Sequence, residues 1–393
     1  MHKYLIIVLS LLSSLSLFAN DEEQPIVLES DSVATDVTKD IPVSVTTTVY
    51  SDADMEARRN IDGEQPVMPA NIQIGTSKLT LFGYAQTGYT YKHTNKENTN
   101  AFDITRIIFM ANAELTKQLS FFIMYDAAAS KLHEYYGQYA FSPALKVRVG
   151  QFKQPYTLEN IYPPTILDNI SFNNSVLYMT GIATDPALGA TVARDAGVMI
   201  TGDLLPKDGR PQFNYQLGVF NGTGMNIKEN NNQKSVIGML NYMPTSSLLF
   251  SGSFALGTSK AANGKFINNE GVAQIPTGAN YHRNRYALGA ELKTKPVYFR
   301  SEYMWGSDAK VNLQGFYTDF EYHVVPKKFD LIADFDYIDT GNYRDSRGIT
   351  RTVTLGAQYW LYKQCRILSQ YVHTDPKHGA ISNAWITQFQ IAF

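Results

Sequence analysis

Acidic side chains recur at even spacing in two neighbouring segments of the second half of the chain. The set is Asp319, Glu321, Asp330, Asp334 and Asp336. Residues two apart in a β-strand lie on the same face, so each segment would present its carboxylates together. Such a set can act as general acid and base or can hold Ca²⁺. The alternative, which the sequence favours, is the solvated wall of a channel with Arg300 as a nearby partner.

Basic side chains with similar spacing gather in the first half of the chain. They are Arg106, Lys146, Arg148, Lys153 and Arg194. Walls and rings of charged side chains set ion selectivity in channels. If the segments that carry them enclose a lumen, we expect both charged sets, together with Arg300, to line or constrict it.

Other reactive arrangements do not emerge from the sequence. Seven histidines are scattered without metal-ligand spacing on one element, so we predict no metal site. The single cysteine, Cys365, excludes an internal disulfide. Residues 221–224 contain Gly-x-Gly but open a loop that no helix follows, which argues against a dinucleotide cradle. We find no compact Ser/His/Asp set and predict no enzyme activity and no cofactor. The net charge of −2 does not indicate a nucleic-acid partner.

The N-terminus has the pattern of an exported protein. Lys3 supplies a positive charge, residues 5–18 form an apolar stretch, and Ala19 is a small residue at a cleavage point. We expect a signal peptide over residues 1–19. The apolar run 4–19 is shorter than the roughly 20 residues of a transmembrane helix. The mature chain is therefore expected in the periplasm, the medium or the outer membrane.

Residues 20–77 differ in composition from the rest of the chain. Between residues 20 and 75, twelve acidic residues outnumber three basic ones. Such a composition buries little apolar surface and predicts a flexible segment. Residues 43–50 have strand-like composition, so a docked β segment is the alternative there.

From residue 78 onward, apolar and polar residues alternate with a period of two, which is the repeat of a β-strand. Ile107 and Phe109, for example, share one face and Arg106 lies on the other. The pattern predicts sixteen strands, an even number as in bacterial single-chain barrels. Their ranges are 78–91, 101–115, 118–129, 132–141, 145–152, 194–204, 212–222, 234–243, 248–258, 284–294, 296–306, 312–325, 327–340, 349–362, 365–375 and 382–393.

The connections between these strands alternate between short and long. Tight turns such as 116–117, 294–295 and 363–364 alternate with longer links such as 153–193 and 259–283. Membrane barrels combine short periplasmic turns with long external loops in this way. The parity of the strands then places both termini on the periplasmic side.

Three features favour a membrane barrel over a soluble β-sandwich. The strands are about ten residues long, which matches a tilted membrane crossing rather than the five or six residues typical of soluble strands. Their ends carry aromatic residues, as in interfacial girdles. The chain ends on an alternating strand with Phe389, Ile391 and Phe393, which would be an exposed edge in a soluble sheet. We therefore predict an all-β fold, a transmembrane antiparallel barrel over residues 78–393 in which the last strand pairs with the first.

Three stretches of this region resemble the phosphate-selective porin O/P family. Residues 150–156 (GQFKQPY) look like the family's characteristic box, where a strand enters a long loop. Residues 194–202 and 217–222 are similar to the strands that follow that loop. The resemblance covers roughly residues 78–393 and implies a sixteen-stranded, usually trimeric channel of the outer membrane. The terminal Phe393 likewise resembles the signal that the barrel-assembly machinery reads.

The link 153–193 is the longest connection within the predicted barrel. At about forty residues it is too long for an idle loop of a compact domain. Pro155 lies at its entry, and Pro163 and Pro164 interrupt it. We expect it to fold into the lumen and narrow the pore, as the resemblance implies. The alternative is an extracellular flap.

The two charged sets lie on opposite sides of the predicted ring. In a ring of sixteen strands the fifth and the thirteenth are diametrically opposed, and they carry bases and acids respectively. The pore is then expected to hold a transverse field, positive on one wall and negative on the other. The alternative is local neutralisation, because Arg300, Glu302 and Glu291 also point inward near the acids.

These inferences predict an outer-membrane porin for passive diffusion of small hydrophilic solutes or ions, with anions such as phosphate as one candidate class. The expected partners are outer-membrane lipid, the barrel-assembly machinery, the permeating solutes and further copies of the chain in a homotrimer. The alternative function is that of a surface structural or adhesin-type barrel, which would show no conductance in a planar bilayer.

Overall fold

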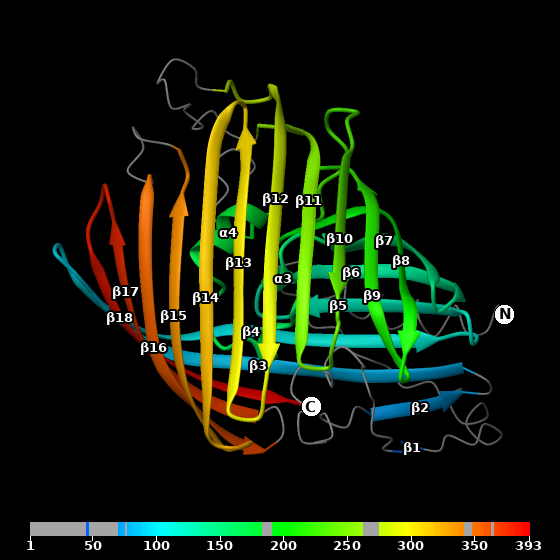
Figure 1. Cartoon of the computed structure of the whole chain (residues 1–393), viewed down its shortest axis with the longest axis horizontal. Coiled ribbons are helices and arrows are strands. Elements are labelled where there is room, and N and C mark those ends of the chain that lie inside the picture. The colour runs from blue at the N-terminus through cyan, green and yellow to red at the C-terminus, as the bar shows by residue number, and fades with distance from the viewer. Residues whose placement is uncertain are drawn as a thin grey trace, which may run out of the picture. The chain divides into compact units, whose positions relative to one another are not determined.

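The computed structural model describes residues 45–46, 70–74, 77–182, 191–261, 275–341, 348–362 and 365–393. Eighteen strands of these ranges join into one antiparallel sheet, and sixteen of them, β3 to β18, close into a barrel (Figure 1). The sixteen are β3 (Ser77–Thr94), β4 (Asn98–Glu114), β5 (Leu119–Asp126), β6 (Lys131–Ser142), β7 (Leu145–Lys153), β8 (Arg194–Lys207), β9 (Arg210–Phe220), β10 (Ser235–Tyr242), β11 (Leu248–Lys260), β12 (Asn280–Lys293), β13 (Val297–Asp308), β14 (Val311–Val325), β15 (Phe329–Asp339), β16 (Ile349–Tyr362), β17 (Cys365–Pro376) and β18 (Ser382–Ala392). All sixteen predicted strands are confirmed, with ends within a few residues of the predicted ones.

The barrel closes where β18 pairs with β3. The register runs from Ala392 opposite Tyr84 to Ser382 opposite Thr94. Just before this stretch, Phe393 and Gly83 exchange two backbone hydrogen bonds of 2.9 Å each. The predicted pairing of the last strand with the first is therefore confirmed, and it leaves no open edge along β18.

Two short strands precede the barrel. Because β18 ends opposite Tyr84, the first residues of β3 have no partner from β18, and β2 (Ala70–Ile74) pairs with them from Ser77 to Leu81. The strand β1 (Val45–Thr46) pairs in turn with β2. Both strands fall within residues 20–77, where the composition predicted a flexible segment. The predicted signal peptide, residues 1–19, lies outside the described residues.

The two faces of each strand differ as the alternation predicted. On β15, Asp330, Asp334 and Asp336 point inward and are buried, whereas Leu331 and Phe335 point outward and are exposed. A soluble protein rarely exposes a continuous apolar belt of this kind, whereas the outer wall of a membrane barrel requires one. The outward face is thus suited to lipid contact.

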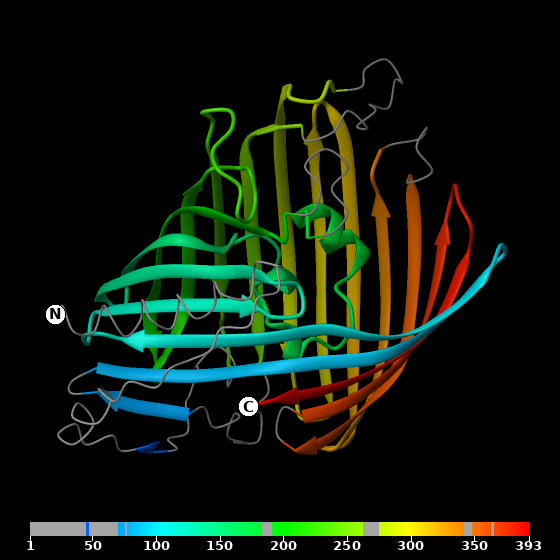
Figure 2. The same cartoon turned by 180° about the vertical axis from the view of Figure 1, so that it is seen from behind.

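The interior is occupied by the connection between β7 and β8. It contains α3 (Leu158–Ile161), the 3₁₀ turn η1 (Pro164–Ile166) and α4 (Asn174–Thr180). Figures 1 and 2 show both helices inside the ring of strands from opposite sides. No helix among the described residues is long and apolar enough to cross a membrane.

Apolar side chains hold α4 against the inner wall. Val176 and Met179 of α4 belong to one buried cluster with Met304 and Leu313 of the wall. At Gly315 of β14, an added Cβ would lie 2.8 Å from the Cβ of the α4 residue Ser175. Glycine at that position therefore lets the helix lie close to β14.

The barrel closure leads to a prediction about the C-terminus. A variant lacking residues 391–393 loses the two Phe393–Gly83 hydrogen bonds and the ring contact of Phe393 with Phe109, whose centroids are 6.1 Å apart. We expect it to fold and insert poorly, measured by heat-modifiable gel mobility and protease resistance after refolding into detergent. Phe393→Tyr, which keeps the backbone and the ring, should fold normally. Normal assembly of the truncated chain would contradict the role given to this strand.

Candidate functional site

Residues 154–193 are called the lumen loop here, and their described parts, 154–182 and 191–193, lie in the interior and meet charged side chains of the wall. Residues 183–190 of the loop lie outside the described part. Two wall carboxylates accept hydrogen bonds from the first backbone N–H groups of its helices. The Glu302 oxygens accept from Leu158 N at 2.8 and 3.0 Å, and those of Asp336 accept from Asn174 N and Ser175 N at 3.1 Å each. These N–H groups have no partner inside a helix, so the carboxylates supply what the helices lack.

The other end of α4 meets a positive charge. Arg285 Nη1 donates to the carbonyls of Tyr178 and Met179 at 2.9 and 2.5 Å. The same guanidinium forms an ion pair with Asp308, with Nε 3.1 Å from Oδ1. A carboxylate at the start of a helix and a guanidinium at its end both suit the helix dipole. Asp336 and Arg285 therefore fix the direction of α4 across the lumen.

The first part of the lumen loop is held by side chains of β17 and β18. Arg366 Nη2 donates to Pro164 O at 3.3 Å, and Gln390 Nε2 donates to Thr165 O at 3.1 Å. Gln370 Nε2 donates to Asp168 O at 2.9 Å. The loop thus contacts the wall formed by the late strands over much of its length. The prediction that residues 153–193 fold into the lumen agrees with these contacts.

Arg300 lies at the centre of a buried charge cluster between the loop and β14. Its Nε donates to Asp319 Oδ2 at 3.0 Å, and Nη2 lies 3.7 Å from Asp168 and 3.9 Å from Glu159. Burial, with the nearby carboxylate of Asp319, raises the pKa of the loop residue Glu159 well above its ordinary value. Asp319 is therefore neutralised locally, as the alternative to a transverse field anticipated.

The acids that the sequence singled out face inward but are covered. Asp319, Glu321, Asp330, Asp334 and Asp336 are exposed by 0, 3, 2, 5 and 1% respectively. The lumen loop hydrogen bonds to two of them, Asp319 through Asn169 and Asn173, and Asp336 through the start of α4. The role of these five acids as pore-lining groups stays a prediction. The lumen loop is docked on the part of the wall formed by β14 and β15, through Asp319 and Asp336.

Two basic residues of the early strands keep contact with solvent. Arg106 and Arg148 point inward and are partly exposed. Arg106 Nη1 donates to Gln86 Oε1 at 2.7 Å, and Arg148 Nε and Nη2 donate to Gln138 Oε1 at 3.1 and 3.0 Å. Arg148 also lies 4.1 Å from the ring centre of Tyr136. These hydrogen-bond partners are neutral, so they do not cancel the guanidinium charges.

The remaining predicted bases are engaged elsewhere. Lys146 Nζ lies 3.4 Å from Asp203 Oδ2, and Arg194 pairs with Glu134 at 3.0 Å. Lys153 Nζ donates to the loop carbonyls of Asn160 and Tyr162 at 2.7 and 2.8 Å. The structure therefore separates the basic set into two solvent-facing arginines, two ion pairs and one loop anchor.

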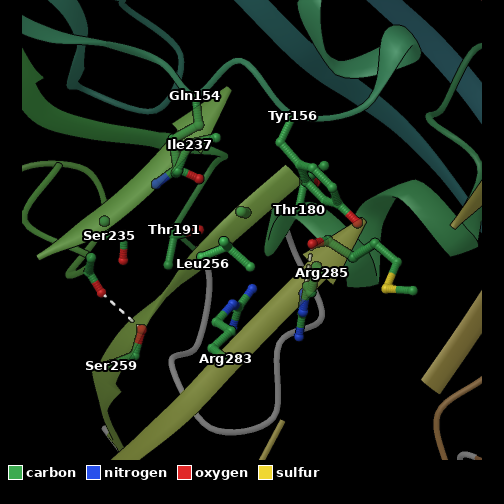
Figure 3. Close-up of a pocket in the computed structure, with 14 residues that line it drawn as sticks. Gln154, Tyr156, Thr180, Thr191, Ser235, Ile237, Leu256, Ser259, Arg283 and Arg285 are labelled. Atoms are coloured by element: carbon green, nitrogen blue, oxygen red, sulfur yellow. Dashed lines mark hydrogen bonds between the residues drawn. The ribbon is translucent and has the colours of Figure 1, made fainter. Parts of the chain in front are cut away.

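A small cavity of about 30 Å³ lies between the lumen loop and strands β10 to β12. Figure 3 shows Arg283 and Arg285 of β12 pointing towards it, with Tyr156 and Thr191 of the loop on its other sides. A cavity of this size holds about two water molecules. Neither arginine belongs to the set of charged residues predicted from the sequence to line the pore.

A signal for the docked loop was nevertheless present in the sequence. Met304, Leu313 and Ile338 occupy inward positions of β13 to β15 that a solvated lumen would fill with polar residues, and all three are buried against the loop or its neighbours.

Gly150 of the GQFKQPY stretch has φ +142° and lies against the backbone of Tyr136, where an added Cβ would be 2.7 Å from the Cα of Tyr136. Its small size permits this close approach.

Comparison with known proteins gives a family and a set of similar structures. The family model described as phosphate-selective porin O and P matches residues 82–383. Among curated proteins, none shows significant sequence similarity to the chain.

Several solved structures resemble the whole barrel. OmpT of Vibrio cholerae is 14% identical, with a TM-score of 0.59 and coverage of 82% of this chain and 100% of that chain. An anion-selective porin from Comamonas acidovorans is 14% identical, with a TM-score of 0.59 and coverage of 81 and 100%. Salmonella typhi OmpF in complex with daunomycin is 13% identical, with a TM-score of 0.57 and coverage of 80 and 98%. At such identities the likeness shows the fold. Because the family model spans most of the barrel, the chain belongs to the phosphate-selective porin O and P family of the bacterial outer membrane.

Proposed function

We propose that this outer-membrane porin, which lets small hydrophilic solutes diffuse passively, favours anions over cations. The observation that carries the proposal is the pairing of Arg106 and Arg148 with neutral glutamines at partly exposed positions of the inner wall. A guanidinium stays charged at any pH of interest. Two such groups on one wall raise the local concentration of anions.

The burial of the acidic residues also supports a preference for anions. The carboxylates on β14 and β15 are buried, and the lumen loop or wall residues contact most of them. A charge covered in this way, with a cation such as Arg300 beside Asp319, contributes less to the potential felt by a passing ion than an exposed charge does. The solvent-facing wall is therefore more positive than the formal charges of the two walls suggest.

Phosphate is the candidate solute that the family description names, and the Comamonas acidovorans porin is described as anion-selective. The partly exposed bases of this chain suit small anions in general. We therefore propose small inorganic anions as the solute class, with phosphate as one member to be tested by its block of chloride current.

The remaining expectations concern assembly. One similar structure, OmpT of Vibrio cholerae, is described in a trimer form, and we propose a homotrimer for this chain. We also propose that residues 1–19 are cleaved on export, that residues 20–77 lie on the periplasmic side and that the assembly machinery reads Phe393.

The family and the fold are those of a channel rather than of an enzyme.

The first prediction from this proposal concerns selectivity. In planar bilayers with a KCl gradient, Arg106→Gln combined with Arg148→Gln should shift the reversal potential towards cations, because two uncompensated charges leave the wall. The control is Arg351→Gln on β16, an exposed arginine that lies 4.0 Å from Asp375. The control should leave the reversal potential unchanged. An unmoved reversal potential in the folded double variant would contradict the proposal.

The second prediction concerns the lumen loop. Asp336→Ala removes the acceptor of two α4 N–H groups, and each unpaired buried donor costs about 1–3 kcal/mol. We expect α4 to loosen and the open-channel current to become noisier, and we expect a variant with α4 replaced by a short glycine linker to conduct more. A folded linker variant with unchanged conductance would indicate that the loop does not limit the pore. If the unmodified protein showed no conductance in a planar bilayer, the result would favour the adhesin-type alternative.

A further inference from the structure

Three side chains with metal-binding atoms meet beside the tight turn that joins β14 to β15. Glu321 and His323 lie two residues apart on the inner face of β14, and the register places Asp330 of β15 opposite His323. His323 Nδ1 lies 2.7 Å from Asp330 Oδ1 and 3.4 Å from Glu321 Oε1. One ligand atom from each residue falls within 4.8 Å of the other two. Within the described part of the chain, this is the one group with such a geometry.

The two carboxylates are held by donors from the next strands. Gln358 Nε2 donates to Glu321 Oε1 and to Asp330 Oδ2 at 2.8 Å each, and Trp360 Nε1 donates to Asp330 Oδ2 at 2.8 Å. Arg366 Nη1 donates to Gln358 Oε1 at 2.7 Å, which fixes the amide with its NH₂ towards the carboxylates. Metal ligands are commonly oriented by outer hydrogen bonds of this kind.

We propose that Glu321, His323 and Asp330 form a site for a divalent first-row metal ion, with Zn²⁺ as the preferred ion. A Zn²⁺ ion holds nitrogen and oxygen ligands at about 2.0–2.2 Å, so ligands of one ion lie about 3–4 Å apart. The separation of 3.4 Å between His323 and Glu321 lies within that range, and the 2.7 Å between His323 and Asp330 falls slightly short of it. The ligand atoms of Glu321 and Asp330 lie within 4.8 Å of each other, so side-chain adjustments can bring all three onto one ion. The imidazole favours Zn²⁺ over Ca²⁺ and Mg²⁺, which prefer oxygen ligands alone.

The proposed metal site does not include Arg106 or Arg148. Metal binding would be a function in addition to passive diffusion. The proposal departs from the expectation of no metal site, which rested on the absence of histidines at metal-ligand spacing. Asp330 comes close to His323 because the register of β14 and β15 places the two residues opposite each other. A bound ion would join β14 to β15 at the end of the lumen next to their turn.

The test is a Zn²⁺ titration of the full chain refolded in detergent and stripped of metal, in competition with a chromophoric chelator. We expect one Zn²⁺ per chain, with an affinity that excess Ca²⁺ does not abolish. His323→Gln and Asp330→Asn should each weaken binding at least about ten-fold, the lower end of the effect known for groups around metal sites. The matched control is His373→Gln on β17, whose ring lies 2.8 Å from Asn383 and outside the proposed site.

A second readout needs no ligand variant. Trp360 donates to the proposed ligand Asp330, so Zn²⁺ should change the tryptophan fluorescence of the wild-type chain. The change should vanish in Trp360→Phe and persist in Trp305→Phe and Trp385→Phe. No saturable binding, equal affinity in His323→Gln, or a fluorescence change that survives Trp360→Phe would each overturn the proposal. If His323→Gln does not fold, the tryptophan variants alone decide between the site and adventitious binding.

Discussion

Every backbone N–H and C=O that meets hydrocarbon must find a partner within the protein, and the barrel depends on this constraint. It explains why sixteen strands pair in a ring and why Phe393 exchanges two hydrogen bonds with Gly83. It is also consistent with the pairing of β2 with the start of β3, where β18 has already ended. Closure in turn gives the wall two faces, an apolar one outside and a charged one inside.

The interior then has to accommodate a helical segment, and it does so with charge. Glu302 and Asp336 accept the first N–H groups of α3 and α4, while Arg285 donates to the last carbonyls of α4. An unpaired buried polar group costs about 1–3 kcal/mol, so these contacts determine where the loop can lie. Because the loop occupies the acidic wall, Arg106 and Arg148 on the opposite wall remain partly exposed to solvent.

The strands and the inward or outward face of each residue could be predicted because period-two alternation is a local property of the sequence. The entry of the loop into the lumen could be expected from its length and from the family resemblance, but its individual contacts could not. They join residues far apart in the sequence, such as Leu158 and Glu302, which are 144 positions apart. For the same reason, the burial of the five acids could not be predicted from the sequence. Only the register and the loop contacts show that they are covered, and that His323 meets Asp330.

With the acidic wall covered, the partly exposed arginines should give the lumen a net positive wall. The most direct test is the zero-current potential of the unmodified, refolded protein in a planar bilayer with a ten-fold KCl gradient. We expect a potential of the sign given by chloride preference, and we expect its magnitude to fall at high salt because the charges are screened. A potential of the opposite sign would show cation preference and would rule out a net positive lumen.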